Sequence, residues 1–333
     1  MRETATEIEY IGVYVDDIIH ATSSKESHKT LHEYCTKFFP TTTQGELTWI
    51  LGMEIKRDRA THTLTLNQTQ ATLTFLDSCG MRTASPLPTP MEANWQYGDE
   101  PPVSDQKLHS EYRSQVGSIS YLSQCTRPDI TFAVSKLCRH LHNPNQACFS
   151  ALGHLIRYLA GTPTHGISYS FQTTTQLRLE CYADSSYGGE HCAQAKSHHG
   201  YLIYFAGGII DWSSNLQNTI ALSSAEAEFI CAFHASRSII YYRQLLEEFG
   251  IVQTEPTVLW EDNQACIAQS KNPVNHKRCK HILIKYHYLR TLASQGHLRL
   301  QYIDTKHQLA DVLTKPLPNV DFRRLIPSLV TPV

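Results

Sequence analysis

The sequence predicts a mixed α/β fold, and three stretches in its carboxyl-terminal half carry that prediction. Residues 177–184 alternate apolar and polar side chains, a period of two that is typical of a strand with one buried face. Residues 201–212 hold two strand-like segments around a Gly-Gly pair, which predicts a hairpin and, with the preceding strand, a three-stranded meander. Ser223 followed by Glu226 is a capping box that starts a helix.

The first 83 residues predict a small α/β piece that begins with a hairpin. Residues 13–19 place Asp16 and Asp17 between two apolar runs, hence at the tip of that hairpin. A carboxylate pair there suits a divalent metal, and it equally suits an ordinary solvated turn. Periodicity predicts the next elements to be a helix at 27–39 and strands at 47–57 and 63–66.

A proline-rich stretch separates this piece from a helical region. Residues 84–102 contain five prolines, a composition that cannot continue a helix or a central strand. Three apolar stripes at helical spacing follow, and they run from Tyr112 to Leu122, from Ile130 to Leu141 and from Ala151 to Leu159. The predicted divisions are a partial domain at 1–83, a linker at 84–107, a helical region at 108–174 and a domain at 175–333.

The helix that starts near residue 222 carries two acids with different expected roles. Glu226 belongs to the capping box and satisfies backbone donors. Glu228 lies on the same side as Ala225 and Ala232, small residues that let this side approach a sheet closely. Glu228 is therefore the better candidate for a buried functional acid.

Two later segments bring further acids to the ends of regular elements. Residues 257–262 alternate as a strand that ends at Asp262. A helix predicted over 308–314, with Thr305 as its cap and Gln308 three residues on, holds Asp311 in its first turns. The remaining predicted elements are a helix at 265–270 and a strand at 298–303.

Composition describes a soluble globular chain of about two domains, with 333 residues, 41% hydrophobic and 18% charged. No apolar run approaches about 18 residues and no signal peptide is visible, so we expect an intracellular protein without a membrane partner, in a cytoplasmic particle or the nucleus. The ten cysteines contain no C-x-x-C pair and are expected to be small buried side chains. A net charge of −2 excludes a globally basic nucleic-acid binder but allows a local basic patch.

Four carboxylates at the ends of strands or on helices that pack near them are expected to converge at one edge of a mixed sheet. They are Asp184, Glu228, Asp262 and Asp311. Taken singly, Asp184 also suits an ordinary turn cap. An oxygen-only cluster favours Mg²⁺, with Mn²⁺ as a substitute, and two such ions about 3.5–4 Å apart would promote phosphodiester hydrolysis. His307, four residues before Asp311, is a candidate for proton transfer or product release, and it equally suits a plain exposed position.

The stretch between Asp262 and Asp304 contains no acid but many lysines, arginines and histidines. It predicts contacts to nucleic-acid phosphates, with a solvated helix face as the alternative. The candidate nucleic-acid-binding residues are Lys277, Arg278, Lys280, Lys285 and Arg290. The histidines and cysteines of this stretch, and those near residues 191–199, do not have the paired spacings of a zinc site.

Seven stretches, in the same order along the chain, carry a resemblance to a known family. They are YVDD at 14–17, ILGMEIKRD at 50–58, YLSQCTRPDI at 121–130, YADSSYGG at 182–189, LSSAEAEF at 222–229, EDNQACI at 261–267 and QLADVLTKPLP at 308–318. On these motifs the chain resembles the carboxyl-terminal part of a copia-type retrotransposon Pol polyprotein, which is the end of a reverse transcriptase followed by its ribonuclease H domain.

The resemblance implies a ribonuclease H fold for residues 175–333, a mixed five-stranded sheet with flanking helices. A partial reverse-transcriptase palm and a helical thumb or connection region would precede it. The resemblance also implies that the four acids bind two metal ions and hydrolyse the RNA strand of an RNA/DNA hybrid. Asp16 and Asp17 match the palm hairpin of the polymerase site, with Asp16 as the metal ligand.

The resemblance departs from the family at the front of the chain. A polymerase of this type needs a further upstream aspartate and fingers, whereas fifteen residues precede Asp16, so we expect no DNA synthesis by this chain alone. The expected partners are an RNA/DNA hybrid or other nucleic acid, together with other parts of the Pol polyprotein. The alternative function is that of a catalytically inactive, nucleic-acid-binding remnant of a transposable element.

Overall fold

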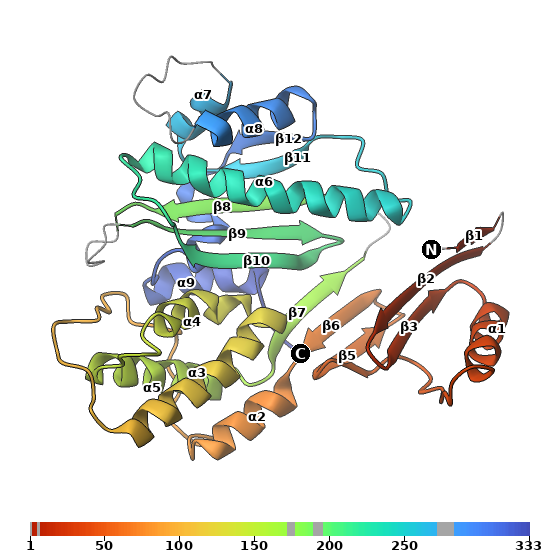
Figure 1. Ribbon diagram of the computed structural model, residues 1–333, viewed down its shortest axis with the longest axis horizontal. Helices are drawn as coiled ribbons and strands as arrows, with labels where there is room; N and C mark the ends of the chain where they lie inside the picture. The colour runs from red at the N-terminus through yellow and green to blue at the C-terminus, as the bar shows by residue number, and fades with distance from the viewer. Residues whose placement is uncertain (1, 5–6, 172–176, 189–195, 272–282) are drawn as a thin grey trace.

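Three β-sheets organise the protein in the computed structural model, which describes residues 2–4, 7–171, 177–188, 196–271 and 283–333 (Figure 1). Their strand orders are β1-β2-β3, β13-β7-β6-β5-β4 and β10-β9-β8-β11-β12. Helices lie between and over these sheets, so the predicted mixed α/β fold is confirmed.

The first sheet is an antiparallel one that carries the amino-terminal pair of aspartates. Its strands are β1 (Arg2–Thr4), β2 (Glu7–Tyr14) and β3 (Asp17–Thr22), and α1 (Lys25–Thr36) follows them. Asp16 lies in the turn between β2 and β3, and Asp17 pairs with Tyr14, which confirms the predicted hairpin. The predicted helix starts two residues earlier than expected because Ser24 caps it, its Oγ accepting from the Ser27 backbone N–H at 3.3 Å.

The second sheet joins strands from three separate parts of the chain. Its strands are β4 (Trp49–Ile50), β5 (Met53–Asp58), β6 (Thr63–Asn67), β7 (His165–Ser170) and β13 (Thr331–Pro332), and α2 (Thr69–Ser78) follows β6. The predicted strand at 47–57 is split in two because Leu51 and Gly52, both at positive φ, form a turn. β13 pairs with β7, so the last residues of the chain return to this sheet.

Residues 84–105 form no helix or strand, as their prolines predict, and they pack onto the helices that follow. The Trp95 indole, for example, donates to the Ala147 carbonyl at 3.1 Å. The helices are α3 (Gln106–Cys125), η1 (Pro128–Ile130), α4 (Thr131–Cys138) and α5 (Gln146–Gly161). The predicted apolar stripes are buried in them, except that Leu141 lies beyond the end of α4 and is only partly buried.

A buried ion pair connects these helices. Arg127 and Asp129 are each 1% exposed, and the guanidinium donates two hydrogen bonds to the carboxylate, at 2.9 and 2.7 Å. The Tyr158 hydroxyl of α5 donates to the same carboxylate at 2.8 Å, and Arg127 also donates to the Thr162 carbonyl at 2.8 Å. Each charge is therefore paired and hydrogen-bonded, as a charge in a protein interior must be.

The third sheet is the mixed five-stranded sheet expected from the resemblance. Its strands are β8 (Glu180–Ser186), β9 (His198–Phe205), β10 (Gly208–Leu216), β11 (Thr257–Glu261) and β12 (Leu298–Tyr302). β8, β9 and β10 form the predicted antiparallel meander, and β11 is parallel to both β8 and β12. β8 runs two residues beyond Asp184, because Ser185 and Ser186 pair with His199 and His198 instead of starting the predicted turn.

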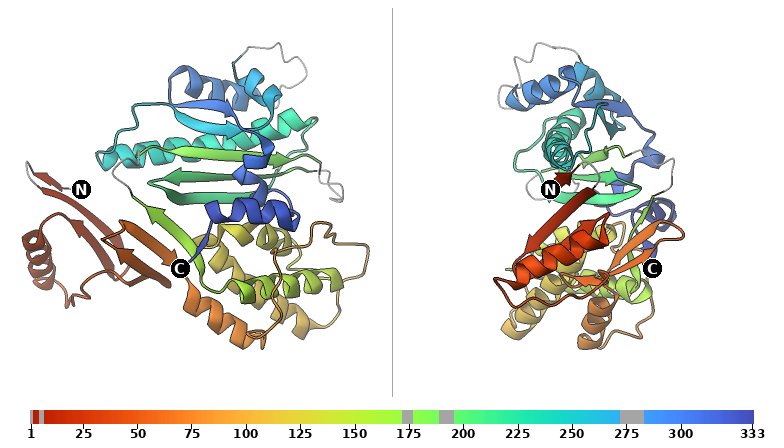
Figure 2. Two further views of the ribbon diagram at one scale, coloured as in Figure 1. Left: turned by 180° about the vertical axis from the view of Figure 1, so that it is seen from behind. Right: turned by 90° about the vertical axis from the view of Figure 1, so that its right-hand side faces the viewer.

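Helices cover both faces of this sheet. α6 (Ser224–Glu248) lies across one face, with α7 (Gln264–Lys271) and α8 (Leu283–Ser294) packed beside it. The carboxyl-terminal segment lies on the opposite face (Figure 2). This segment comprises η2 (Thr305–His307), η3 (Leu309–Leu313), α9 (Asn319–Leu325) and η4 (Ile326–Ser328).

The predicted helix at 308–314 is wrong in type and in its cap. Residues 309–313 form a 3-10 helix, and the side chain of Asp304, not Thr305, caps the preceding turn by accepting from the Lys306 N–H at 2.8 Å. Gln308 explains the difference, because its amide donates to the Ala183 carbonyl at 2.9 Å and so ties the chain to β8. No helix in the described part of the chain is long and apolar enough to cross a membrane.

Candidate metal centre

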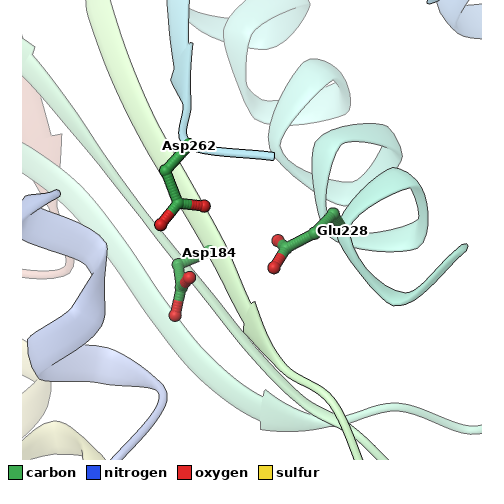
Figure 3. Close-up of side chains that lie close together, drawn as sticks. All are labelled: Asp184, Glu228 and Asp262. Atoms are coloured by element: carbon green, nitrogen blue, oxygen red, sulfur yellow. The ribbon is translucent and has the colours of Figure 1, made fainter. Parts of the chain in front are cut away.

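Three carboxylates from three different elements meet at one edge of the five-stranded sheet (Figure 3). Asp184 lies in β8, Glu228 lies in the second turn of α6, and Asp262 directly follows β11. One carboxylate oxygen of each acid lies within 4.8 Å of those of the other two. β8 and β11 are parallel neighbours with Tyr182 opposite Trp260, so the acids two residues further along both strands come to the same level.

Burial makes Glu228 and Asp262 difficult to ionise. Asp184 and Glu228 are 3% and 5% exposed, and Asp262 is partly buried. Burial raises the pKa of Glu228 well above its ordinary value, and the neighbouring charge of Asp184 raises it further. Burial also raises the pKa of Asp262, whereas a hydrogen bond from Thr305 lowers it. A bound cation would favour the ionised form of Glu228 and Asp262.

Two threonine hydroxyls hold two of the carboxylates in place. Thr305 Oγ1 donates to Asp262 Oδ2 at 2.8 Å, and Thr314 Oγ1 donates to Asp184 Oδ2. Glu228 differs from these two acids, since its buried Oε2 has no hydrogen-bond partner among the described residues. An unpaired buried carboxylate oxygen that faces two other carboxylates is in the position expected of a metal ligand.

The donor set fits a hard divalent cation. Asp184, Glu228 and Asp262 offer only oxygen atoms, which suit Mg²⁺ or Mn²⁺ rather than a thiolate-preferring metal. Of the residues considered for zinc, His198 donates to or accepts from Ser214 Oγ at 2.8 Å, and the group of three acids contains no histidine or cysteine. His191, Cys192, His276, Cys279 and His281 lie outside the described residues.

The fourth predicted acid, Asp311, lies beside this group and is paired with a lysine. It is 5% exposed in η3, and its Oδ1 lies 2.8 Å from the Lys315 ammonium nitrogen. The same nitrogen is 3.8 Å from Asp184 Oδ2, so one lysine connects the fourth acid to the first. Burial and the charge of Asp184 raise the pKa of Asp311 to about 8, although Lys315 lowers it.

A glycine lets η3 lie close to the sheet. Gly200 of β9 pairs with Asp184, and a Cβ at residue 200 would come within 2.5 Å of the Leu313 side chain and 3.1 Å of its carbonyl oxygen. The close approach brings Asp311 and Thr314, on either side of Leu313, to the edge where Asp184 lies. Only glycine leaves room for this packing.

Four residues of the site were not among the sequence candidates: Glu261, Thr305, Thr314 and Lys315. Glu261 is fully buried next to Asp262, and its Oε1 accepts from the Asn263 N–H at 3.0 Å. Burial raises its pKa well above the ordinary value. A signal for it was present, because the alternation of β11 puts Glu261 on the same face as buried Leu259. Nothing comparable in the sequence identifies Thr314 or Lys315, because the turn of η3 is what brings their side chains to Asp184.

The other predicted site residues are not part of the group of three acids or lie outside the described part of the chain. His307 is exposed on η2. Lys285 is partly buried with its ammonium 5.6 Å from the Phe233 ring centre, and Arg290 is partly exposed on the same helix, α8. Lys277, Arg278 and Lys280 lie in 272–282, outside the described residues. Asp16 and Asp17 are both exposed, on the first sheet.

Comparison with known proteins gives strong matches to transposon polyproteins, while no protein-family model matches the chain. The chain is 36% identical over 322 residues to the retrovirus-related Pol polyprotein from transposon RE2 of Arabidopsis thaliana, covering 94% of this chain and 21% of that protein. It is 35% identical over 315 residues to the corresponding polyprotein from transposon TNT 1-94 of Nicotiana tabacum, covering 93% of this chain and 23% of that protein. The chain thus spans about a fifth of the length of these curated relatives.

Among solved structures, the N-terminal RNase H domain of a Mycobacterium tuberculosis protein, studied as a fusion with maltose-binding protein, aligns with 14% identity and a TM-score of 0.32. The alignment covers 46% of this chain and 99% of that one.

Proposed function

The chain belongs to the Pol polyproteins of copia-type retrotransposons, and we propose that its carboxyl-terminal domain, residues 175–333, is a metal-dependent ribonuclease H. It would hydrolyse the RNA strand of RNA/DNA hybrids. The observation that carries the proposal is the meeting of Asp184, Glu228 and Asp262 within 4.8 Å at one sheet edge. These three elements are far apart in the sequence, and an arrangement of oxygen ligands alone suits phosphodiester chemistry.

We propose that Asp184, Glu228, Asp262 and Asp311 together bind two Mg²⁺ or Mn²⁺ ions. When bound, the ions would supply the charge that stabilises the attacking and the leaving oxygen of the phosphodiester. The protein's own part is to hold the ligands, since Thr314 and Thr305 fix the orientation of two carboxylates. Burial keeps bulk water from the acids, which strengthens their attraction for a cation.

The basic stretch after Asp262 is the proposed contact for the nucleic acid. Lys285 and Arg290 lie on α8, which packs against α6, the helix that carries Glu228. Lys277, Arg278 and Lys280 precede α8 in the sequence. Contacts from these side chains to phosphates would position the strand and would weaken as the salt concentration rises.

For DNA synthesis we propose that this chain is not sufficient. Asp16 and Asp17 are exposed, and among the described residues no third carboxylate joins them in a group with metal-ligand spacing. A polymerase site needs its charges arranged around the incoming phosphates. Primer extension by the purified chain would overturn this part of the proposal.

Cleavage of a labelled RNA/DNA hybrid in Mg²⁺ tests the proposed function. We expect the wild-type chain to cut the RNA strand, EDTA to abolish cutting, and Asp262→Asn to reduce it by at least about a hundredfold because a ligand loses its charge. Asp99→Asn is the matched control, since Asp99 is an exposed carboxylate of the proline-rich segment. Equal cleavage by wild type and Asp262→Asn would refute the assignment. Salt-dependent binding without cleavage would favour the inactive remnant.

A further inference from the structure

The ammonium group of Lys315 lies between two of the four acids. Its nitrogen is 2.8 Å from Asp311 Oδ1 and 3.8 Å from Asp184 Oδ2. Both carboxylates are almost completely buried, with side-chain exposures of 8% and 4%, whereas the lysine side chain is 36% exposed. The lysine thus reaches inward from the surface and places its charge between two buried carboxyl groups.

The pairing divides the four acids into two sets. Asp184, Glu228 and Asp262 face one another with an oxygen of each inside 4.8 Å, and Asp311 is absent from that set. Asp311 instead directs an oxygen to Lys315. In the absence of metal, therefore, one internal cation already neutralises part of the acidic cluster, which lowers the cost of burying carboxylates together.

A lysine in this position competes with a divalent ion for the same oxygens. A Mg²⁺ ion shared by Asp184 and Asp311 would need to lie about 2.0–2.1 Å from an oxygen of each. The ammonium contacts Asp311 at the distance of a close hydrogen bond, so the ion and Lys315 would overlap or lie within a few ångströms as like charges. One of the two must leave.

We propose that Lys315 is an internal counter-ion that occupies the second metal position of the metal-free protein. The first ion binds to Asp184, Glu228 and Asp262, and a second ion bound by Asp184 and Asp311 must displace the ammonium. The inference rests on the proposed metal-dependent function and adds to it the order of metal binding and the residue that sets it. Lys315 acts here as a positioning residue, through the carboxylates.

Calorimetric titration of the full chain with Mn²⁺, in the absence of nucleic acid, tests the inference. We expect the wild type to bind one ion more tightly than the second. Lys315→Met keeps the length and removes the charge, so the second ion should bind at least about tenfold more tightly, and thermal stability should fall without metal and recover with it. Lys107→Met, an exposed lysine at the start of α3, should behave as wild type.

Lys315→Arg provides a second variant that keeps the positive charge. It should retain weak binding of the second ion, and this result stays informative if Lys315→Met does not fold in the absence of metal. If Lys315→Met binds each of the two ions with the same affinity as the wild type does, the role of Lys315 is overturned. The proposed function is then still in place. If neither the wild type nor Asp262→Asn binds Mn²⁺, the role of Lys315 and the proposed function are both overturned.

Discussion

Without divalent metal, the wild-type chain should lose stability relative to Asp311→Asn as the pH rises from about 6.5 to about 8. The cause is Asp311, whose pKa is raised to about 8 by burial and by the charge of Asp184. Between the ordinary pKa of an aspartate, about 4, and this value, the folded state keeps a proton that the unfolded state has released. Because the unfolded state then binds fewer protons, the free energy of unfolding falls as the pH rises through this interval.

The buried histidines act against the carboxylates at the lower end of this window. Burial lowers the pKa of His140 to about 4 and that of His199 to about 3, so these side chains stay neutral in the fold. An unfolded histidine is half protonated at about pH 6.5, so these histidines raise the free energy of unfolding as the pH rises through the lower part of the window. Because Asp311→Asn keeps the same histidines, the difference in slope between it and the wild type reports on Asp311.

One proton changes the free energy of unfolding by about 1.4 kcal/mol per pH unit, so this window of roughly 1.5 units corresponds to about 2 kcal/mol for Asp311. Glu228 and Glu261, whose pKa values are also raised by burial, act in the same direction. Asp311→Asn should therefore remove only part of the decline that the buried acids cause.

Urea denaturation followed by circular dichroism in EDTA, at several pH values from 6.5 to 8, measures the effect. Wild type and the exposed-site control Asp99→Asn should have the same slope, and the slope of Asp311→Asn should be less negative or more positive. Saturating Mg²⁺ should flatten the wild-type curve because it binds the ionised carboxylates. Equal slopes for wild type and Asp311→Asn between pH 6.5 and 8 would refute the reasoning.

Two further substitutions test the framework around the site. Asp129→Asn should lower the free energy of unfolding by about 3–5 kcal/mol, because it leaves the buried Arg127 charge uncompensated, whereas Asp77→Asn breaks an exposed pair and should change it by at most about 1 kcal/mol. Urea denaturation measures both, and similar small losses would show that the Arg127 network is not a buried ion pair in solution. Gly200→Ala should reduce hybrid cleavage at least about tenfold, because the new Cβ would meet a side chain of η3 at 2.5 Å and displace that turn. Gly153→Ala in α5, where a Cβ meets nothing within 4 Å, is the matched control and should raise stability by about 0.5–1 kcal/mol, and cleavage by Gly200→Ala at the wild-type rate would show that η3 tolerates the change.

The three acids that meet could be anticipated because each lies on an element with a strong local pattern. The period of two in β8 and β11 predicts that Asp184 and Asp262 lie near the ends of their strands. The capping box predicts where α6 starts. Glu228 follows from that start, since its place on the helix is then fixed. That the two strands are parallel neighbours was not evident from periodicity, which reports local structure alone.

The fourth acid and its lysine depend on contacts that local patterns do not encode. The sequence around Asp311 favours an α-helix. The Gln308 side chain instead donates a hydrogen bond to the Ala183 carbonyl, and the turn that follows is a 3-10 helix. Lys315 reaches Asp184, 131 positions earlier in the sequence, only because of that turn. Propensity was overridden here by packing against the sheet.

The segment that carries Asp311 is held from two sides. Val312, Leu313 and Phe322 are buried in the same hydrophobic cluster as the apolar stripes of α3, α4 and α5. The Phe322 ring lies 5.8 Å from that of Tyr158, whose hydroxyl donates to Asp129 of the buried ion pair. The sheet and α6 carry Asp184, Glu228 and Asp262, whereas the helices of residues 106–161 help to position the fourth acid. Since Lys315 follows η3 after a single residue, the helical region also helps to place the charge that competes with the second metal ion.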